Sequence, residues 1–129
     1  MASDFKEVDY LDPRRRFGNR GEDLAAVFLM SRGFKILARN WSCRLGEIDV
    51  IAEKNGAVHF VEVKTRRSRM YGNPEDSITR TKLLHLRRTI EVYLQQARSA
   101  PRNYQADALA ITAIPGQKPE FYYVENIFG

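Results

Sequence analysis

The sequence lacks the residues and segments on which several classes of protein depend. It has one cysteine, Cys43, so no disulfide can form within the chain. No stretch approaches the roughly 18 to 20 apolar residues that cross a membrane. The first residues mix acidic and basic side chains and lack the apolar centre of a secretory signal. We therefore expect a soluble, cytoplasmic protein that has no membrane partner.

The length and charge of the chain fit one globular domain with a polyanionic partner. A chain of 129 residues can bury a sizeable core but is short for two domains. Lys and Arg number 21 against 16 Asp and Glu, which gives a net charge of +5. This balance favours nucleic acid as a partner without establishing it.

The first 17 residues show no sustained periodicity and end near the basic run Arg14–Arg16. We interpret residues 1–17 as a basic N-terminal arm and residues 18–129 as a single domain. The arginine run is equally compatible with a solvated surface and with an arm that contacts phosphates.

The periodicity of the remaining sequence predicts helices and strands in a definite order. Apolar spacing, with Asn19 as a cap and Gly33 as a left-handed stop, indicates a helix over 19–32. The same spacing indicates a second helix over 78–98. Strands are expected at 34–41, 46–54, 57–65, 105–113 and 120–126. This order predicts an α/β fold in which a central mixed sheet of about five strands is flanked by helices.

A two-residue turn, Asn55–Gly56, joins the second and third predicted strands. Asn-Gly favours a type I′ hairpin turn, which fixes the register of the two strands. In that register Asp49 lies opposite Glu62, in a pair whose Cα atoms approach to about 4.5 Å. Glu47 then lies opposite Lys64 on the same face. The sequence therefore predicts a cluster of charged side chains on one face of the hairpin.

The other face of the hairpin is expected to be apolar and buried, and it carries Ile48, Val50, Val61 and Val63. Two carboxylates about 4 Å apart repel by roughly 4 kcal/mol at an effective dielectric constant of 20. A divalent cation relieves this repulsion, and carboxylate oxygens suit Mg²⁺ or Mn²⁺, whereas no His or Cys cluster indicates zinc. Lys64 could then polarise a water or neutralise charge on a phosphodiester. The alternative is a set of ordinary cross-strand ion pairs.

The segments Gly46–Asp49 and Phe60–Lys64 resemble the core of the PD-(D/E)xK nuclease superfamily. That core has a carboxylate on one strand and acid-x-lysine on the next, although the proline of the motif is missing before Asp49. More narrowly, the chain is similar to the YraN-type bacterial family of uncharacterised proteins over about residues 17–113. The similarity includes Gly18–Glu22, Gly33–Trp41, the hairpin, Arg66, Tyr71–Gly72, Lys82 and Asp107.

The resemblance implies a restriction-endonuclease-like fold and a set of site residues. Asp49, Glu62 and the backbone carbonyl of Val63 would bind the metal, and Lys64 would lie beside the nucleophilic water. In relatives that resemble Holliday-junction resolvases, a glutamate of the first helix joins the site, and Glu22 matches it. A capping box with Asn19 explains Glu22 equally well. Junction resolvases act as dimers, so the resemblance is compatible with a homodimer, although the sequence itself does not give the oligomeric state.

Basic and aromatic side chains follow the predicted site. Those that could grip phosphates are Arg66, Arg67, Arg69 and Tyr71, together with Lys82 of the second helix. A solvated loop and an exposed helix face are the alternatives. His59 and His85 lack partners at ligand spacing and are interpreted as structural. Asp107 receives no chemical role, and a structural hydrogen bond at the start of a strand is expected of it.

These patterns lead to one leading functional hypothesis and two alternatives. The leading one is an endonuclease that hydrolyses phosphodiesters, DNA before RNA, with Mg²⁺ or Mn²⁺ as cofactor. A non-catalytic nucleic-acid-binding protein that keeps the nuclease fold is the second. A subunit whose protein partner supplies the substrate is the third. Glu47 enters the first hypothesis as a partner that orients Lys64 or as an additional ligand.

Overall fold

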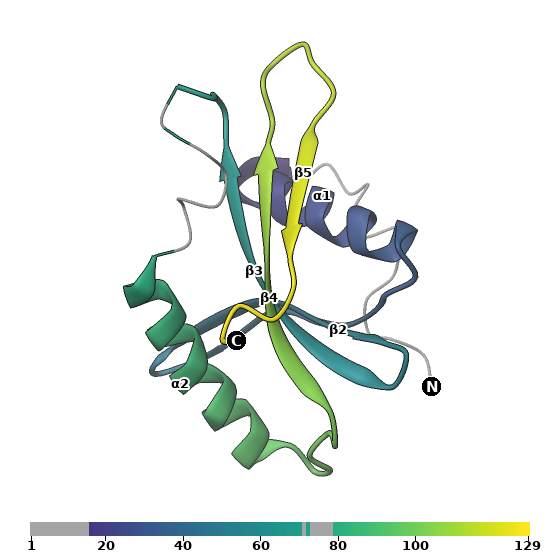
Figure 1. Ribbon diagram of the computed structural model, residues 1–129, viewed down its shortest axis with the longest axis vertical. Coiled ribbons are helices and arrows are strands. Elements are labelled where there is room, and N and C mark those ends of the chain that lie inside the picture. The colour runs from purple at the N-terminus through teal and green to yellow at the C-terminus, as the bar shows by residue number, and fades with distance from the viewer. Residues whose placement is uncertain (1–15, 71, 73–78) are drawn as a thin grey trace.

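The computed structural model describes residues 16–70, 72 and 79–129. Figure 1 shows the elements in their spatial arrangement. In chain order they are α1 (Arg16–Ser31), β1 (Lys35–Cys43), β2 (Gly46–Lys54), β3 (Ala57–Arg66), α2 (Arg80–Gln96), β4 (Tyr104–Thr112) and β5 (Glu120–Val124). The predicted order of helices and strands is confirmed. Of the predicted arm over 1–17, residues 1–15 lie outside the described residues, and Arg16 and Phe17 belong to α1.

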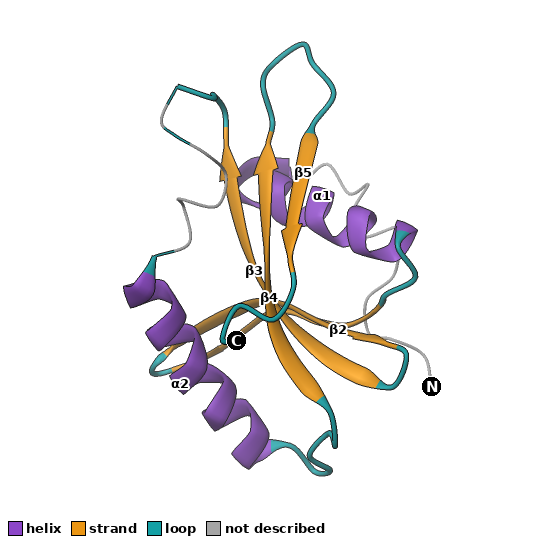
Figure 2. Cartoon of the chain, in the orientation of Figure 1, coloured by secondary structure: helices purple, strands orange, loops and turns teal. Residues whose placement is uncertain are grey.

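The strands form one five-stranded sheet in the order β1-β2-β3-β4-β5. Strands β3 and β4 are parallel, because α2 connects them, and the other neighbours are antiparallel. The sheet is therefore mixed, as predicted, and Figure 2 shows it between the helices. The molecule has an α/β fold with a central mixed sheet flanked by helices.

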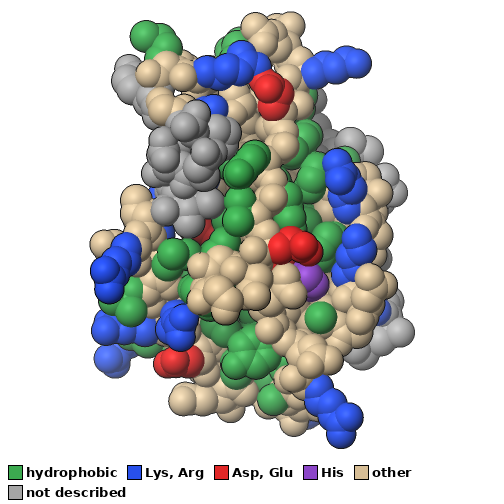
Figure 3. Space-filling view, in the orientation of Figure 1, with side chains coloured by type: hydrophobic (Ala, Val, Ile, Leu, Met, Phe, Trp, Pro, Cys, Tyr) green, Lys and Arg blue, Asp and Glu red, His purple; other side chains and the backbone are tan. Residues whose placement is uncertain are grey.

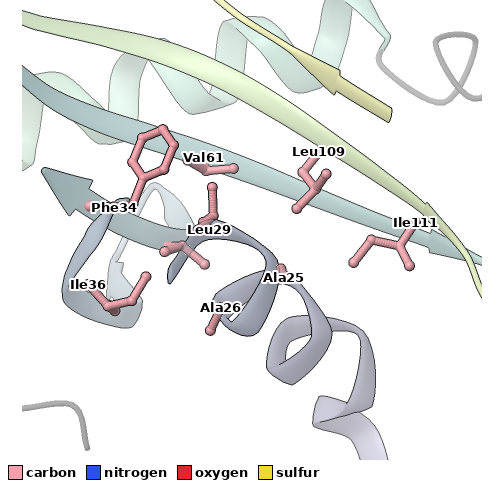
Figure 4. Packing of buried hydrophobic residues seen from close by; sticks show 10 residues of the cluster. Ala25, Ala26, Leu29, Phe34, Ile36, Val61, Leu109 and Ile111 are labelled. Carbon is pink, nitrogen blue, oxygen red and sulfur yellow. The ribbon is translucent and has the colours of Figure 1, made fainter. Parts of the chain in front are cut away.

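The two helices cover opposite faces of the sheet. Against α1, the core consists of Ala25, Ala26, Leu29, Phe34, Ile36, Val50, Ala52, Val61, Leu109 and Ile111 (Figure 4). Against α2, it consists of Ile48, Ile51, Val58, Phe60, Leu86, Ile90 and Ala106. Consecutive residues such as Phe60 and Val61 fall into different cores because side chains alternate along a strand. Both faces of the sheet are thus buried.

Beyond the Val50 and Val61 pair the sheet splits into two arms, β1–β2 and β3–β4, and we call the base of this split the fork. The β2–β3 ladder runs from the turn only as far as Val50 and Val61. Beyond that pair β2 continues with β1 to Gly46, and β3 continues with β4 to Arg66. Figure 1 shows the two pairs of strands diverging from the centre of the sheet.

The predicted turn is confirmed, and one helix boundary is corrected. Asn55 and Gly56 both have positive φ angles, 52° and 79°, as a type I′ turn requires. Gly33, with a φ of 89°, ends α1 as predicted. The same helix begins at Arg16, so the prediction that Asn19 caps it is wrong. In the sequence, Phe17 lies seven residues, or about two helical turns, before Leu24. The apolar spacing of this helix therefore begins before Asn19.

The second helix is two residues shorter at each end than predicted. It begins after Thr79, whose side chain accepts a hydrogen bond from the Lys82 backbone N–H at 3.2 Å. It ends at Gln96, so Ala97 is a cap and lies beyond the helix. No helix among the described residues is long and apolar enough to span a membrane.

Asp107, for which a structural hydrogen bond was predicted, is a fully buried hydrogen-bonding centre on β4. Its Oδ2 lies 2.5 Å from Nδ1 of His59 and accepts a hydrogen bond from the Tyr123 hydroxyl. Its Oδ1 accepts from the Gln105 side chain at 2.8 Å and from the Asn126 backbone N–H at 2.9 Å. Asp107 therefore joins β3, β5 and the C-terminal segment, and His59 is structural as predicted.

Candidate metal centre

Three carboxylates meet at the fork between the two arms of the sheet. Glu22 comes from α1, and Glu47 and Asp49 come from β2. One oxygen of each side chain lies within 4.8 Å of one oxygen of each of the others. Glu22 is half-buried and inside the helix, so the capping-box explanation for it is excluded. The structure thus groups Glu22 and Glu47, two residues that the sequence left open, with Asp49.

Two glycines allow the helices to approach the strands at this point. A Cβ on Gly21 would lie 2.0 Å from Oγ1 of Thr65 on β3. A Cβ on Gly46 would lie 2.7 Å from Oγ1 of Thr89 on α2. Each glycine directly precedes a carboxylate of the group, Glu22 or Glu47. Glycine at both positions therefore allows the backbone that carries each carboxylate to lie against a neighbouring side chain.

Asp49 lies at the fork and links the two arms of the sheet. The Val63 backbone N–H of β3 donates a hydrogen bond to its Oδ2 at 2.7 Å. Burial raises the pKa of the Asp49 carboxyl to about 7, and the charge of Glu62 raises it as well, while the Val63 hydrogen bond opposes the rise. A carboxyl with this pKa is only partly ionised at neutral pH unless a cation stabilises its charge.

Glu62 and two lysines, Lys64 and Lys82, lie near Asp49 towards α2. Burial raises the pKa of the Glu62 carboxyl, and the charges of Lys82 and Lys64 oppose the rise. Burial also lowers the pKa of the Lys82 ammonium, and neighbouring Lys64 lowers it further. A cavity of about 180 Å³ opens here, lined by Gly46, Glu47, Glu62, Lys82, His85, Leu86 and Thr89. The fork thus combines acids with two lysines.

The predicted register is wrong beyond the Val50 and Val61 pair. Asp49 and Glu62 interact through their charges but do not pair across the ladder. The β2–β3 ladder does not reach the predicted pair of Glu47 and Lys64, and Glu47 pairs with Ser42 of β1 on its other edge. The regular hairpin ends because the Asp49 side chain takes the Val63 N–H that a continued ladder would engage.

The prediction that one apolar face carries Ile48 together with Val50 is also wrong. Ile48 packs in the core under α2, whereas Val50, Val61 and Val63 belong to the side of α1. The alternation of β2 therefore changes between Ile48 and Val50. The cavity beside Asp49 is nevertheless lined by both Glu47 and Glu62, so charged residues of both strands border one cavity.

The donor set at the fork fits a hard divalent cation. Three carboxylates with oxygens within 4.8 Å offer the ligands that Mg²⁺ and Mn²⁺ prefer. Among the described residues, Glu62 is not a member of this group, although its charge reaches Asp49. In a strand the N–H and C=O of one residue point the same way, so the Val63 carbonyl faces the side on which its N–H meets Asp49.

The arginines after β3 make contacts within the protein. Arg66 donates hydrogen bonds to Oγ1 of Thr112 at 2.9 Å and to the carbonyl of Gly72 at 2.5 Å. Arg69 forms an ion pair with Glu120 at the start of β5. Arg67 is exposed, and Tyr71 lies outside the described residues. Of the predicted phosphate-binding residues, Lys82 is the one that the structure brings to the carboxylates.

Two residues of β1 that were not predicted, Arg39 and Asn40, lie against Glu22. Arg39, whose side chain is 3% exposed, pairs with Asp23 at 2.7 Å and lies 3.9 Å from Glu22. Burial raises the pKa of Glu22, while a hydrogen bond from the Asn40 side chain and the charge of Arg39 oppose the rise. An asparagine inside a strand pattern is unfavourable, and this was the available signal. Nothing in the sequence indicated that Arg39 is buried.

Comparison with known proteins identifies relatives along most of the chain. The model of the uncharacterised protein family UPF0102 matches residues 21–111. A UPF0102 protein of Neisseria meningitidis is 45% identical over 112 residues, which cover 87% of this chain and 94% of the relative. Another, of Caldicellulosiruptor saccharolyticus, is 43% identical over 98 residues, covering 76% and 83%. A third, of Nocardia farcinica, is 36% identical over 115 residues, covering 89% and 91%. The resemblance to the YraN-type family is thereby confirmed.

Proposed function

The chain belongs to the uncharacterised protein family UPF0102, and we propose that it is a metal-dependent nuclease that hydrolyses nucleic-acid phosphodiesters, with DNA as its substrate. The observation that carries the proposal is the group of Glu22, Glu47 and Asp49 at the fork, with Glu62 and two lysines beside it. The resemblance of the hairpin to the PD-(D/E)xK nucleases supports it. A homodimer is compatible with the same resemblance.

Each residue of the fork has a part in this proposal. Asp49 is the central ligand, and Glu22 and Glu47 complete the carboxylate set for Mg²⁺ or Mn²⁺. When bound, the metal supplies Lewis-acid catalysis to a phosphodiester. The resemblance adds Glu62 and the Val63 carbonyl as further ligands. Lys64 and Lys82 offset the negative charge that develops on the phosphate as it is attacked.

A positive surface near the fork supports nucleic acid as the substrate. Lys and Arg side chains gather over α2 in Figure 3, and Arg80, Arg87 and Arg88 of this helix are exposed. Lys82 of the same helix lines the cavity that contains Glu62. Of these cations, Lys82 is the one that borders the cavity with Glu62, so it is the one placed to contact a phosphate beside the carboxylates. Arg67 adds an exposed charge after β3.

The proposal is tested by a cleavage assay on end-labelled nucleic acids. Duplex, single-stranded, flapped and four-way-junction DNA, with RNA counterparts, are incubated with the full chain and Mg²⁺ or Mn²⁺. We expect cleavage of at least one DNA substrate, and its complete loss when EDTA removes the metal. Salt-sensitive binding without cleavage of any substrate would instead establish the non-catalytic binding protein.

The affinity for Mn²⁺ is expected to depend on pH between 5 and 7. The metal binds the ionised form of Asp49, whose pKa burial raises to about 7, so protons compete with it below that pH. Each pH unit below about 7 should weaken binding by about tenfold, and the affinity should level off above about pH 8.

Isothermal titration calorimetry at several pH values measures this dependence. In the matched control Glu53→Gln, an exposed carboxylate of β2 away from the fork is neutralised, and the pH dependence should persist. An affinity that stays constant from pH 5 to 7 would show that Asp49 does not have to lose a proton for metal to bind.

A further inference from the structure

Asn40 has a backbone conformation that asparagine tolerates better than most residues but that is unusual inside a strand. Its φ is 54°, in the left-handed region, and it lies within β1. Asn and Asp are the side chains that enter this region most readily after glycine. A left-handed residue inside a strand persists where the surrounding structure fixes it, and such residues concentrate at functional sites.

The residues on either side of Asn40 show what this conformation does. Arg39 pairs with Asp23 of α1, whereas Trp41 packs in the core under α2, with its ring centroid 5.3 Å from that of Tyr93. In a regular strand, residues two apart share one face. Here Arg39 and Trp41 point to opposite faces of the sheet, so the alternation of side chains along β1 is reversed at Asn40.

This change of face also brings the Asn40 side chain to α1. Its amide donates a hydrogen bond to the Glu22 carboxylate. Arg39 and Asn40 are consecutive, yet both contact acidic residues of one helix, which regular alternation does not allow. The left-handed φ of Asn40 is the feature that permits both contacts.

The alternation of side chains along β2 is reversed at the same level. Arg39 pairs with Val50 and Trp41 pairs with Ile48, so Asn40 and Asp49 lie between the same two pairs. Val50 packs under α1 and Ile48 under α2. The two strands thus change faces together, with Asn40 on one and Asp49 on the other.

We propose that Asn40 is a positioning residue of the carboxylate site, whose left-handed backbone turns its amide onto Glu22 and holds that carboxylate against Asp49 and Glu47. The inference rests on the proposed function, because it gives Asn40 the task of arranging a ligand for a divalent cation. Asn40 acts through Glu22 and does not itself contact the metal. A carboxylate oriented by a hydrogen bond binds a metal more tightly than one that must be ordered on binding.

The test compares Mn²⁺ binding by the full-length wild type and Asn40→Gly in isothermal titration calorimetry. Glycine adopts the left-handed region without steric cost, so this variant keeps the backbone and removes only the amide. We expect binding to weaken by about tenfold, which corresponds to the loss of one hydrogen bond to a charged group. Asn55→Gly is the matched control, since Asn55 has a φ of 52° in the hairpin turn and should retain wild-type affinity.

A second comparison separates action through Glu22 from a general effect on the fold. In a Glu22→Gln background, Asn40→Gly should cause no further loss of Mn²⁺ affinity, because the group that Asn40 orients is already altered. A tenfold loss that persists in this background would overturn the inference, as would wild-type affinity of Asn40→Gly alone. Failure of Asn40→Gly to fold, seen in its thermal unfolding curve, would show that Asn40 is structural and also overturn it. Absence of Mn²⁺ binding by the wild type would overturn the metal centre itself.

Discussion

Asp49→Asn is expected to abolish metal binding at the fork and metal-dependent cleavage with it. Asp49 is the carboxylate that the other acids surround, and its replacement removes both a ligand and the charge that attracts the cation. Because a catalytic metal contributes several kcal/mol of charge stabilisation, cleavage should fall by at least about a thousandfold. Calorimetry with Mn²⁺ and the cleavage assay measure the two losses, whereas nucleic-acid binding should be equal or tighter.

The stability of the same variant provides a second readout that needs neither metal nor substrate. In the metal-free wild type the pKa of Asp49 is about 7, raised from 3.8. The folded state then holds more protons than the unfolded state between these values, so this carboxyl makes the protein less stable as the pH rises from about 4 to 7. Asp49→Asn removes that cost, and at pH 8 its free energy of unfolding should exceed that of the wild type by at least about 1 kcal/mol.

Glu53→Gln is the control for both measurements, because Glu53 is an exposed carboxylate of the same strand. It should leave metal binding, cleavage and the pH dependence of stability unchanged. If Asp49→Asn retained wild-type cleavage, the fork would not be the catalytic centre. If it were no more stable than the wild type at pH 8, the charge of Asp49 would not be destabilising.

Lys64→Ala is expected to lower turnover by about a hundredfold while metal affinity stays within about threefold of the wild type. Removing one preorganised charge that stabilises a transition state typically costs two to three orders of magnitude in turnover. A cation beside carboxylates opposes the binding of another cation, so its removal should not weaken Mn²⁺ binding. Together with Asp49→Asn, this variant separates charge stabilisation from metal binding.

Lys82 lies near both Lys64 and Glu62, so it can offset part of the same negative charge as Lys64. Lys82→Ala should therefore show a smaller loss of turnover, and the double variant a loss larger than either. Lys54→Ala is the matched control, since Lys54 lies at the turn end of the hairpin, away from the fork. Equal turnover of Lys64→Ala and the wild type would exclude Lys64 from catalysis.

The sequence was sufficient for those parts of the fold that depend on local interactions. Apolar spacing predicted the helices and strands, and Gly33 predicted the end of α1. The Asn55–Gly56 turn fixed the register as far as Val50 and Val61, because a tight turn aligns the strands next to it. The same turn pattern predicted that Asp49, Glu62 and Lys64 lie close together, and the structure brings these three residues to the fork.

What the tertiary structure alone decided is where that register ends and which side chains meet there. Strand β3 pairs with β4, whose paired residues lie 46 positions further along the chain, and β2 pairs with β1, so both strands keep a neighbour where their own ladder ends at Val50. Glu22 joins Asp49 because Gly21 lets α1 approach β3, and Asn40 turns β1 over at the same level. These contacts join segments distant in sequence, and no local pattern encodes the distance between them. The group of carboxylates is therefore a product of packing, although each of its members was visible in the sequence.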